Sequence, residues 1–357
     1  MNRILYILLC LLAFISCDRR ELTYTYEPTV SILLKADWSD MSVKPTGMSV
    51  YCYPSSGESP TIIQTNIVDS TTLQLGIGEY KILVFNQVPS DFSTINFSGL
   101  SDYETAEVYA AATSSRWYSS KADEELVVEP DELAIATYHS VVVTKEAVDE
   151  ILGLREQYDY SAEDEEPYIT IEVAPKVVVK VTRVTVSLDG IHNLSAARST
   201  LYGMSTGYKF SSQTTHSNYA THLLESWSKT IYEADVTQGE IVAYFTCFGL
   251  PETVVASRQV DESWGGTMHL EMLLVDNSTI VERDYTLVDK TTLLYESEVA
   301  YKSDDDAVAY DDSDVDISID IEDALTLPDV QAEGGYSEGF TGEVLDWEDE
   351  QTVGLEI

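Results

Sequence analysis

The residues of this chain that most resemble a catalytic motif are Gly203-Met204-Ser205-Thr206-Gly207, which match the pattern G-x-S-x-G. In hydrolases this pattern places a nucleophilic serine on a sharp turn between a strand and a helix. Residues 208–212 show no helical periodicity, so we expect a turn between strands instead. Three histidines that follow the motif could act as its base: His216, His222 and His269. No sequence pattern places an acidic partner beside any of them. The sequence therefore predicts no catalytic residues and no enzyme activity.

A second candidate site is the acidic stretch that contains Asp312, Asp314 and Asp316, which have the D-x-D-x-D spacing of a calcium loop. The sixth position of such a loop requires glycine, and here it is Ile317. Polar residues also alternate with apolar ones in this stretch: Asp314, Asp316, Ser318, Asp320 and Glu322. This alternation favours one solvated face of an edge strand, whose charge discourages pairing with other sheets. We expect no metal and no cofactor, and these three aspartates are the only candidates for a cation.

Four cysteines are present, and two of them lie in or directly after the apolar leader, Cys10 and Cys17. The other two, Cys52 and Cys247, are far apart in sequence. A disulfide between them is an open alternative, but two buried free thiols fit their strand contexts better. The cysteines and histidines show no metal-binding spacing.

The N-terminal leader has the features of a secretory signal. Arg3 supplies a positive charge, an apolar run extends from Ile4 to Ile15, and the small Ser16 precedes Cys17. Phe14 is too bulky for the position three residues before an ordinary cleavage site. A lipoprotein leader tolerates it, and Cys17 then becomes the acylated mature N-terminus; an exported protein with an incidental cysteine is the alternative.

Residues 1–16 are thus predicted to be a signal peptide, and residues 17–28 a lipidated tether. Several acyl chains make membrane attachment effectively permanent, because each buried methylene contributes about 0.8 kcal/mol. No other apolar run approaches the roughly 18 residues that a membrane-spanning helix needs.

The charge balance restricts the partners of the folded part. The chain has 62 acidic residues against 20 basic ones, and residues 303–357 contain no Lys, Arg or His. Such a surface repels phosphate groups, which argues against nucleic-acid binding and against a folded part lying on anionic lipid.

Strand signals dominate the rest of the chain. The period-2 pattern of residues 30–38 is typical of a half-buried strand. Further strands are expected at 48–54, 73–75, 80–85, 108–112, 125–128, 141–143, 168–190, 239–250, 268–287, 317–321, 342–347 and 352–357. One helix is expected, with Thr144 as its N-cap and an apolar stripe through Arg155; the acidic run 159–166 then reads as loop.

Many short strands with a single helix predict an all-β protein with two tandem β-sandwich domains. Pro175 interrupts the long strand region 168–190, and proline cannot donate to a central ladder. We therefore expect an N-terminal sandwich at residues 29–175, containing the helix. A C-terminal sandwich follows at 176–357, with an acidic insertion at about 303–316.

The order of these segments resembles a known family. It comprises the leader ending at Cys17, a first strand ending in Trp38, MSVYCYP, LQLGIGEYKILVFN, VVVKVTRVTVSLDG, ARSTLYGMSTGYKF and the terminal GGYSEGFTGEVLDWEDEQTVGLEI. This order is similar to the fimbrillin-like lipoproteins of Bacteroides and Porphyromonas, in the type V pilus superfamily. The resemblance implies transthyretin-like sandwiches and a lipid-anchored protein at the outer membrane and cell surface.

In that family the expected role is a structural, anchor or accessory subunit of fimbriae, with pilin subunits as partners through strand addition. Polymerisation there follows cleavage after an arginine near the first strand. No arginine lies between Glu21 and Ser115, and cleavage at Arg19 or Arg20 would remove no strand. The sequence therefore favours an anchor or non-polymerising subunit. A glycan-binding surface lipoprotein is the alternative, because the chain has 23 tyrosines, although no ligand-binding residues are identified.

Overall fold

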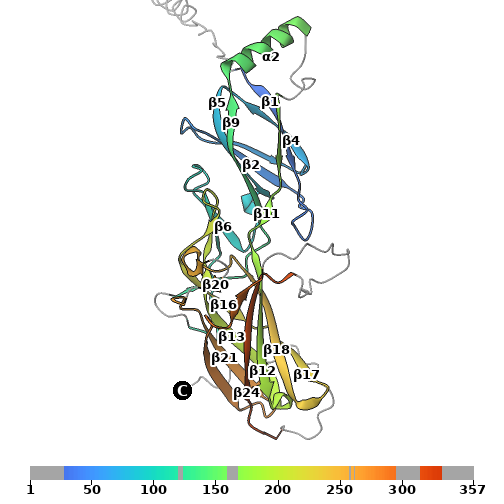
Figure 1. Cartoon of the computed structure of the whole chain (residues 1–357), viewed down its shortest axis with the longest axis vertical. Coiled ribbons are helices and arrows are strands. Elements are labelled where there is room, and N and C mark those ends of the chain that lie inside the picture. Colours follow the sequence, from blue (N-terminus) through green and yellow to red (C-terminus); the bar gives the residue numbers. More distant parts are fainter. Residues whose placement is uncertain are drawn as a thin grey trace, which may run out of the picture.

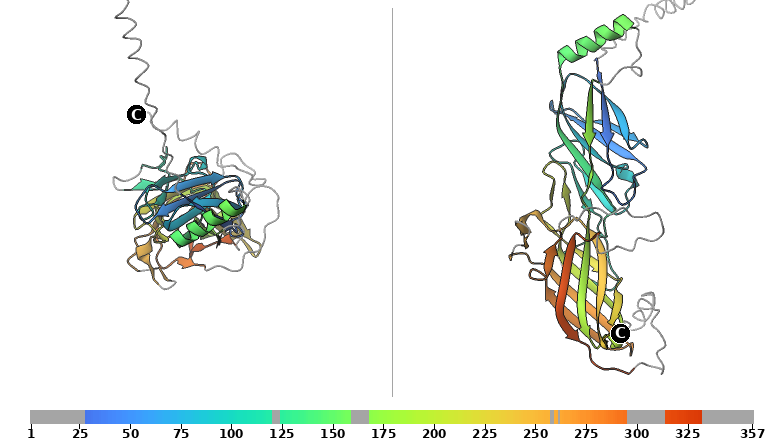
Figure 2. Two further views of the ribbon diagram at one scale, coloured as in Figure 1. Left: turned by 90° about the horizontal axis from the view of Figure 1, so that it is seen from above. Right: turned by 45° about the vertical axis from the view of Figure 1, so that its right-hand side comes forward.

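The structure is a computed structural model that describes residues 28–119, 124–158, 168–256, 259–260, 262–294 and 314–331. The described chain forms an elongated stack of β-sheets with one α-helix at one end (Figure 1). The sheets of the two ends follow each other along the long axis, as the right-hand view of Figure 2 shows. A predominantly β fold with one short helix is therefore confirmed. Within these ranges no helix is long and apolar enough to cross a membrane.

Two sheets form the end of the molecule that carries the helix. Sheet I has the strand order β10-β1-β4, and sheet II has the order β11-β9-β5-β2-β3. Their strands are β1 (Val30–Ala36), β2 (Met48–Pro54), β3 (Thr61–Thr65), β4 (Ser70–Leu75), β5 (Gly78–Asn86), β9 (Ala134–Val143), β10 (Ile169–Val173) and β11 (Lys176–Val177). Apolar side chains from both sheets, such as Ile32, Val50 and Leu73, pack into one core and are fully buried. The period-2 pattern at the start of the chain thus directs alternate residues of β1 into this core.

The helix α2 (Lys145–Tyr158) covers the end of this core. The backbone N–H of Ala147 donates to the Thr144 hydroxyl at 3.2 Å, which confirms Thr144 as the N-cap. Val148 and Ile151 are buried against the sheets, so the helix is fixed by its apolar stripe.

Two further sheets form the opposite end of the molecule. Sheet IV has the order β22-β21-β13-β16-β8, and sheet V has the order β17-β18-β12-β24-β23. Their strands are β8 (Glu125–Leu126), β12 (Lys180–Asp189), β13 (Leu194–Ser205), β16 (Tyr219–Leu224), β17 (Ser228–Tyr232), β18 (Asp235–Cys247), β21 (Thr267–Leu274), β22 (Ile280–Thr286), β23 (Thr291–Leu293) and β24 (Ile317–Thr326). A second core lies between them and includes Val184, Leu201 and Phe245.

A small sheet III, with the order β15-β14-β7-β6, lies between the two pairs of sheets. The remaining elements are β6 (Ile95–Ser98), β7 (Glu107–Ala110), β14 (Gly207–Lys209), β15 (Thr214–Thr215), the hairpin of β19 (Val255–Ala256) and β20 (Gln259–Val260), and three short 3-10 turns, η1 (Pro89–Asp91), η2 (Ile191–Asn193) and η3 (Glu252–Val254). Because β7 pairs with β14, this sheet joins chain segments about a hundred residues apart.

A third core, rich in aromatic rings, fills the space between sheet III and sheet II. The Phe210 ring, which follows β14, lies 6.4 Å from the ring of Phe85 on β5 and 6.2 Å from that of Phe97 on β6. Sheet II is therefore covered on both faces, since Val50 points into the first core and Tyr51 into the third. This double burial explains why β2 and the second half of β5 are buried without alternation and are mostly apolar.

The acidic strand near the C-terminus differs from its sequence-based expectation. β24 runs parallel to β12 and antiparallel to β23, and Ser318 is only 2 % exposed. The reason is that β12 brings Arg183 opposite Ser318, where its Nη2 donates to the hydroxyl at 3.0 Å and lies 3.6 Å from the Asp320 carboxylate. The prediction of a solvated edge strand is thus wrong for residues 317–319. Among the acidic residues of β24, Glu322 and Asp323, beyond the residues paired with β23, are exposed, whereas Asp320 is half-buried.

The third core supports a stability prediction. Replacing the buried Phe210 by Ala is expected to lower the free energy of unfolding by about 3–5 kcal/mol, because the cavity lies where both halves of the chain meet. Ile62→Ala, at a side chain that is 50 % exposed, is the control and should change it by less than about 0.5 kcal/mol. Urea unfolding followed by circular dichroism measures both values, and equal effects would contradict this assignment.

Candidate functional site

Ser205 of the G-x-S-x-G motif is the last residue of β13, and β14 follows it directly. The hydroxyl is buried and lies 2.9 Å from the carbonyl oxygen of His216 and 3.0 Å from that of Gly207. A strand–turn–strand with a hydroxyl directed at backbone carbonyls lacks the exposed serine of a nucleophile elbow. The expected turn is therefore what the structure contains at this motif.

The three histidines lie in different environments. His216 Nδ1 lies 3.3 Å from the Thr206 hydroxyl, and its Nε2 lies 3.3 Å from the carboxylate of Glu107 without the alignment of a hydrogen bond. Burial lowers the pKa of His216, against the opposing effect of Glu107. His269 lies on sheet IV and contacts Asp284 at 2.7 Å. Within the described chain the Ser205 hydroxyl makes its hydrogen bonds to backbone groups and not to these imidazoles.

His222 on β16 points into the core between sheets IV and V. Its ring lies 5.1 Å from that of Phe245, and neither ring nitrogen has a hydrogen-bond partner among the described residues. Burial alone lowers the pKa of His222 to about 4, so the imidazole is neutral near pH 7.

The structure describes two of the three aspartates proposed for a cation, Asp314 and Asp316. Asp312 lies outside the described residues, and Asp316 is committed to β12 through contacts given below. The described ranges contain no group of three or more His, Cys, Asp or Glu side chains arranged to hold a metal ion.

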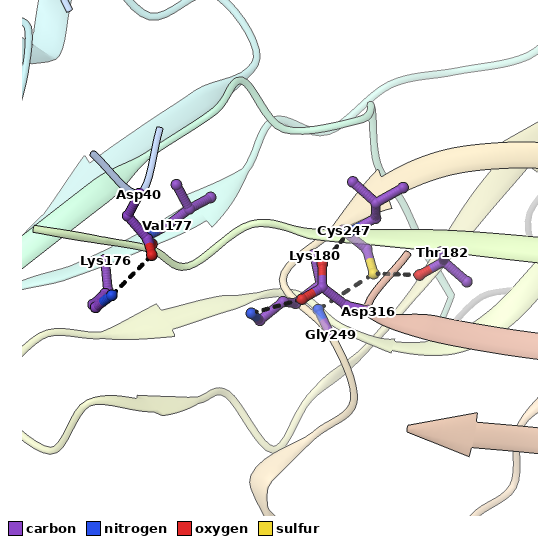
Figure 3. Close-up of polar contacts among 9 residues, drawn as sticks. Asp40, Lys176, Val177, Lys180, Thr182, Cys247, Gly249 and Asp316 are labelled. Carbon is purple, nitrogen blue, oxygen red and sulfur yellow. Dashed lines mark hydrogen bonds and ion pairs between the residues drawn. The ribbon is translucent and has the colours of Figure 1, made fainter. Parts of the chain in front are cut away.

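A series of polar contacts lies along residues 176–182, where the chain passes from one pair of sheets to the other. We call these residues the connecting strand. Asp40, in the loop after β1, receives the backbone N–H of Val177 at 2.7 Å and the ammonium group of Lys176 at 2.9 Å (Figure 3). Asp40 is 18 % exposed in its side chain, so the contact is partly shielded from water.

The same arrangement recurs four residues later in the connecting strand, with a second aspartate. Asp316, just before β24, receives the backbone N–H of Val181 at 2.9 Å and the ammonium group of Lys180 at 2.9 Å (Figure 3). Each aspartate thus binds one Lys-Val pair of the connecting strand through a lysine and the next amide. We call Asp40 and Asp316 the two aspartate brackets; one anchors the connecting strand to β1 and the other to β24.

A buried thiol lies beside the second bracket. Cys247 Sγ accepts the Gly249 N–H at 3.3 Å and lies 3.4 Å from the Thr182 hydroxyl (Figure 3). Burial raises the pKa of Cys247 to about 11, and burial raises that of Cys52 to about 12. Both are buried free thiols, as expected, and remain protonated near neutral pH.

Residues 112–119 and 124–128, which we call the strap, also tie the halves together. β8 pairs in parallel with β16, and the Trp117 ring lies 4.4 Å from the guanidinium of Arg198 on β13. Arg198 in turn forms a 2.6 Å ion pair with Glu271 on β21, and both side chains are largely buried. Local sequence patterns do not predict this strap or the brackets. The only signal was the repeated Lys-Val pair at 176–177 and 180–181, which does not reveal its partners.

The brackets give a prediction that separates their charge from their hydrogen bonds. Asp316→Ala is expected to lower the free energy of unfolding by about 1–3 kcal/mol, because the Val181 amide loses a charged acceptor. Lys180→Met removes only a partly exposed ion pair and should cost less than about 1 kcal/mol. Denaturant unfolding gives both values, and hydrogen exchange of the Val181 amide should accelerate only in the first variant. A larger loss for the lysine variant would refute this assignment.

His222 predicts a pH dependence of stability. Because burial lowers its pKa from 6.5 in the unfolded chain to about 4 when folded, the unfolded state binds the proton first as the pH falls. The contribution of His222 to the free energy of unfolding is fully present above pH 6.5. About 3 kcal/mol of this free energy is lost as the pH falls from 6.5 to about 4.

A His222→Leu variant should lose less stability than the wild type between pH 7 and pH 4, by about 3 kcal/mol. Chemical unfolding of both proteins at the two pH values measures this difference, in which the titration of the carboxylates cancels. Parallel pH profiles would show that the pKa of His222 is the same in the folded and unfolded states, which would refute the shift caused by burial.

Comparisons with solved structures find similar folds in proteins from Bacteroides and Porphyromonas. A protein from Bacteroides ovatus, described as a "putative adhesin", is 16 % identical, with a TM-score of 0.53 over 87 % of this chain and 98 % of its own. The fimbrial anchor protein Mfa2 from Porphyromonas gingivalis is 13 % identical, with a TM-score of 0.41 over 73 % of this chain and 83 % of its own. The tip fimbrial protein Mfa3 from the same organism is 12 % identical, with a TM-score of 0.34 over 76 % and 84 %.

Of these three, the Bacteroides ovatus protein supports the fold assignment, since its TM-score exceeds 0.5. No curated protein matches the chain significantly. The sequence profile of one family matches residues 16–225, which is more than half of the chain. The protein therefore belongs to the family described as Domain of unknown function (DUF5119).

Proposed function

We propose that this chain is a lipid-anchored cell-surface protein of the fimbrillin-like, type V pilus superfamily, acting as an anchor, structural or accessory subunit related to fimbriae. The observation that carries the proposal is the end-to-end arrangement of the sheets, with the start of β1 at the end that carries α2 (Figure 1). A tether before residue 28 therefore enters at one pole and leaves the other pole away from the membrane. The fold shared with the "putative adhesin" of Bacteroides ovatus is in keeping with a surface role.

The anchor in this proposal is Cys17, acylated at the outer membrane after removal of residues 1–16. Cys17 lies outside the described residues, so the argument for it is the leader sequence. The large excess of acidic residues supports a folded part that stands clear of anionic lipid and does not bind nucleic acid.

The first strand supports a fixed subunit over one that loses this strand on assembly. β1 is the central strand of sheet I, parallel to β10 and antiparallel to β4, and Val30, Ile32 and Leu34 are fully buried. Its removal would open the first core, and no arginine between Glu21 and Ser115 offers a site for cleavage there. In the proposed function β1 is retained, and pilin subunits are partners through strand addition at another edge.

The proposed architecture is two transthyretin-like β-sandwich domains, at residues 29–175 and 176–357. In the structure, β10 pairs in sheet I, β11 in sheet II and β12 in sheet V, so the chain changes partners close to Pro175. The protein acts in this proposal by its shape and not as an enzyme, and it needs no cofactor.

A glycan-binding surface lipoprotein is the second candidate. Two pairs of half-buried rings favour it: Trp117 with Tyr118, 5.8 Å apart, and Tyr202 with Tyr219, 5.5 Å apart. The polar groups of the first pair already bind carboxylates, Trp117 to Glu225 and Tyr118 to Glu124. This pair therefore ties the strap to sheet IV, which places glycan binding second.

Replacing Cys17 tests the anchor. Cys17→Ala removes the sulfur that would carry lipid, so the protein is expected to move from the membrane fraction to the soluble fraction. Cell fractionation with immunoblotting measures the change, and Cys52→Ala, at a buried thiol, is the matched control that should stay with the membrane.

The mass and N-terminus of the wild-type protein recovered from cells complete this test. An acylated Cys17 at the start of an otherwise intact chain is expected. An unmodified thiol on a soluble protein would refute the anchor, and loss of residues beyond Trp38 would refute the retention of β1.

A further inference from the structure

One stretch of chain in the sheet I and sheet II pair, residues 59–78, is almost without charge, in a protein that carries a net charge of −42. Between Ser59 and Gly78 the only charged residue is Asp69, although charged residues make up 23 % of the chain. Asp69 is itself paired with the ammonium group of Lys44 at 2.7 Å. This stretch is therefore electrically neutral as folded.

The neutral stretch forms the open edges of two sheets on the same side. β3 is the last strand of sheet II and β4 is the last strand of sheet I, and only residues 66–69 connect them. In the described chain, β3 pairs with β2 alone, so its outer edge carries backbone groups without a neighbouring strand. We call this side, residues 61–75, the neutral edge.

Apolar side chains are exposed along the neutral edge. Ile62 on β3 is 50 % exposed, although it shares a face of sheet II with the buried Tyr51. Ile67, in the connection between the two edge strands, is 67 % exposed. These side chains would be covered if another strand continued sheet II beyond β3.

The longer edge strand β22 is protected in the usual way. β22 at the edge of sheet IV carries Glu282, Arg283 and Asp284, all exposed. Natural proteins place charges on open edges because an uncharged edge invites pairing with another chain. Because β3 and β4 lack such charges, we expect their open edge to be covered by a partner on the cell.

We propose that the neutral edge is an interaction surface to which an extended, uncharged segment of another surface protein adds as the next strand of sheet II, beside β3. Backbone hydrogen bonds to β3 supply the pairing, and apolar or hydroxyl side chains of the segment cover Ile62. A charged segment fits poorly. Its charged groups would lose water on binding, and the neutral edge offers no opposite charge to compensate for that loss. The inference rests on the proposed function, because it names the site of strand addition.

A second copy of this chain is a less suitable occupant. Each copy carries a net charge of −42, so two copies that approach edge to edge repel each other over the rest of their surfaces. A partner of lower charge does not incur this cost.

Cysteine labelling on whole cells tests the inference with the full-length protein. Thr61→Cys places a thiol on β3, and Glu282→Cys places one on the protected edge β22; both native side chains are exposed. The background is low because Cys52 and Cys247 are buried. A membrane-impermeant maleimide is the probe, applied to the purified protein and to cells that display it, with the unsubstituted protein as blank.

The thiol at position 61 should react about tenfold more slowly on cells than in the purified protein, as about 90 % occupancy of the edge requires. The thiol at position 282 should react equally in both. Adding Gln64→Lys, which places a charge on β3, should restore labelling at position 61 on cells; unchanged thermal unfolding shows that the variants fold.

Equal labelling of both positions on cells would overturn the neutral edge as a site while leaving the surface role intact. Absence of labelling at both positions on intact cells would overturn the proposed function and this inference with it. Protection at position 61 that appears in the purified protein, together with a doubled mass in solution, would identify a second copy as the occupant and overturn the inferred partner.

Discussion

The chain segment from Ile169 to Asp189 constrains the rest of the structure, because it is hydrogen-bonded to three sheets in succession. Its strands β10, β11 and β12 belong to sheets I, II and V, with short breaks between them. The two aspartate brackets fix the middle of this segment, one from each side, through charge-assisted hydrogen bonds to its amides. The relative position of the two ends of the molecule is thereby tied to the backbone path of about twenty residues.

The aromatic third core adds a packed interface between the two ends of the molecule. Phe210 from the later part of the chain packs against Phe85 and Phe97 from the earlier part, so sheet II has no solvent-facing surface at this level. The strap through Trp117 and Arg198 fastens the same two parts from another side. The third core and the strap join the halves directly, and the two brackets hold the connecting strand at each end, which leaves little freedom for a hinge.

Much of the fold follows from patterns in the sequence. The alternation in β1 and the N-cap at Thr144 each depend on neighbouring residues, so local patterns predict them. The role of β24 was not predictable in this way, since its acidic face is covered by Arg183 and Lys180 from a strand some 135 residues earlier. The brackets, the strap and the neutral edge likewise depend on which strands become neighbours, which periodicity alone does not determine. The location of Ser205 in a turn between strands was predictable, because the helix that an elbow needs has no pattern there.

The parallel pairing of β1 with β10 has a mechanical consequence. β1 begins at the pole where the tether enters, and β10 leads through Val173 towards the opposite pole. A pull between the two poles therefore draws these neighbouring strands past each other along their length. β1 and β10 are paired over five residues, from Ile32–Ile169 to Ala36–Val173. The hydrogen bonds between these strands then share the load at the same moment instead of opening one by one. Such shear loading is the geometry in which a short ladder resists force best, and it suits a protein held at one end and pulled at the other.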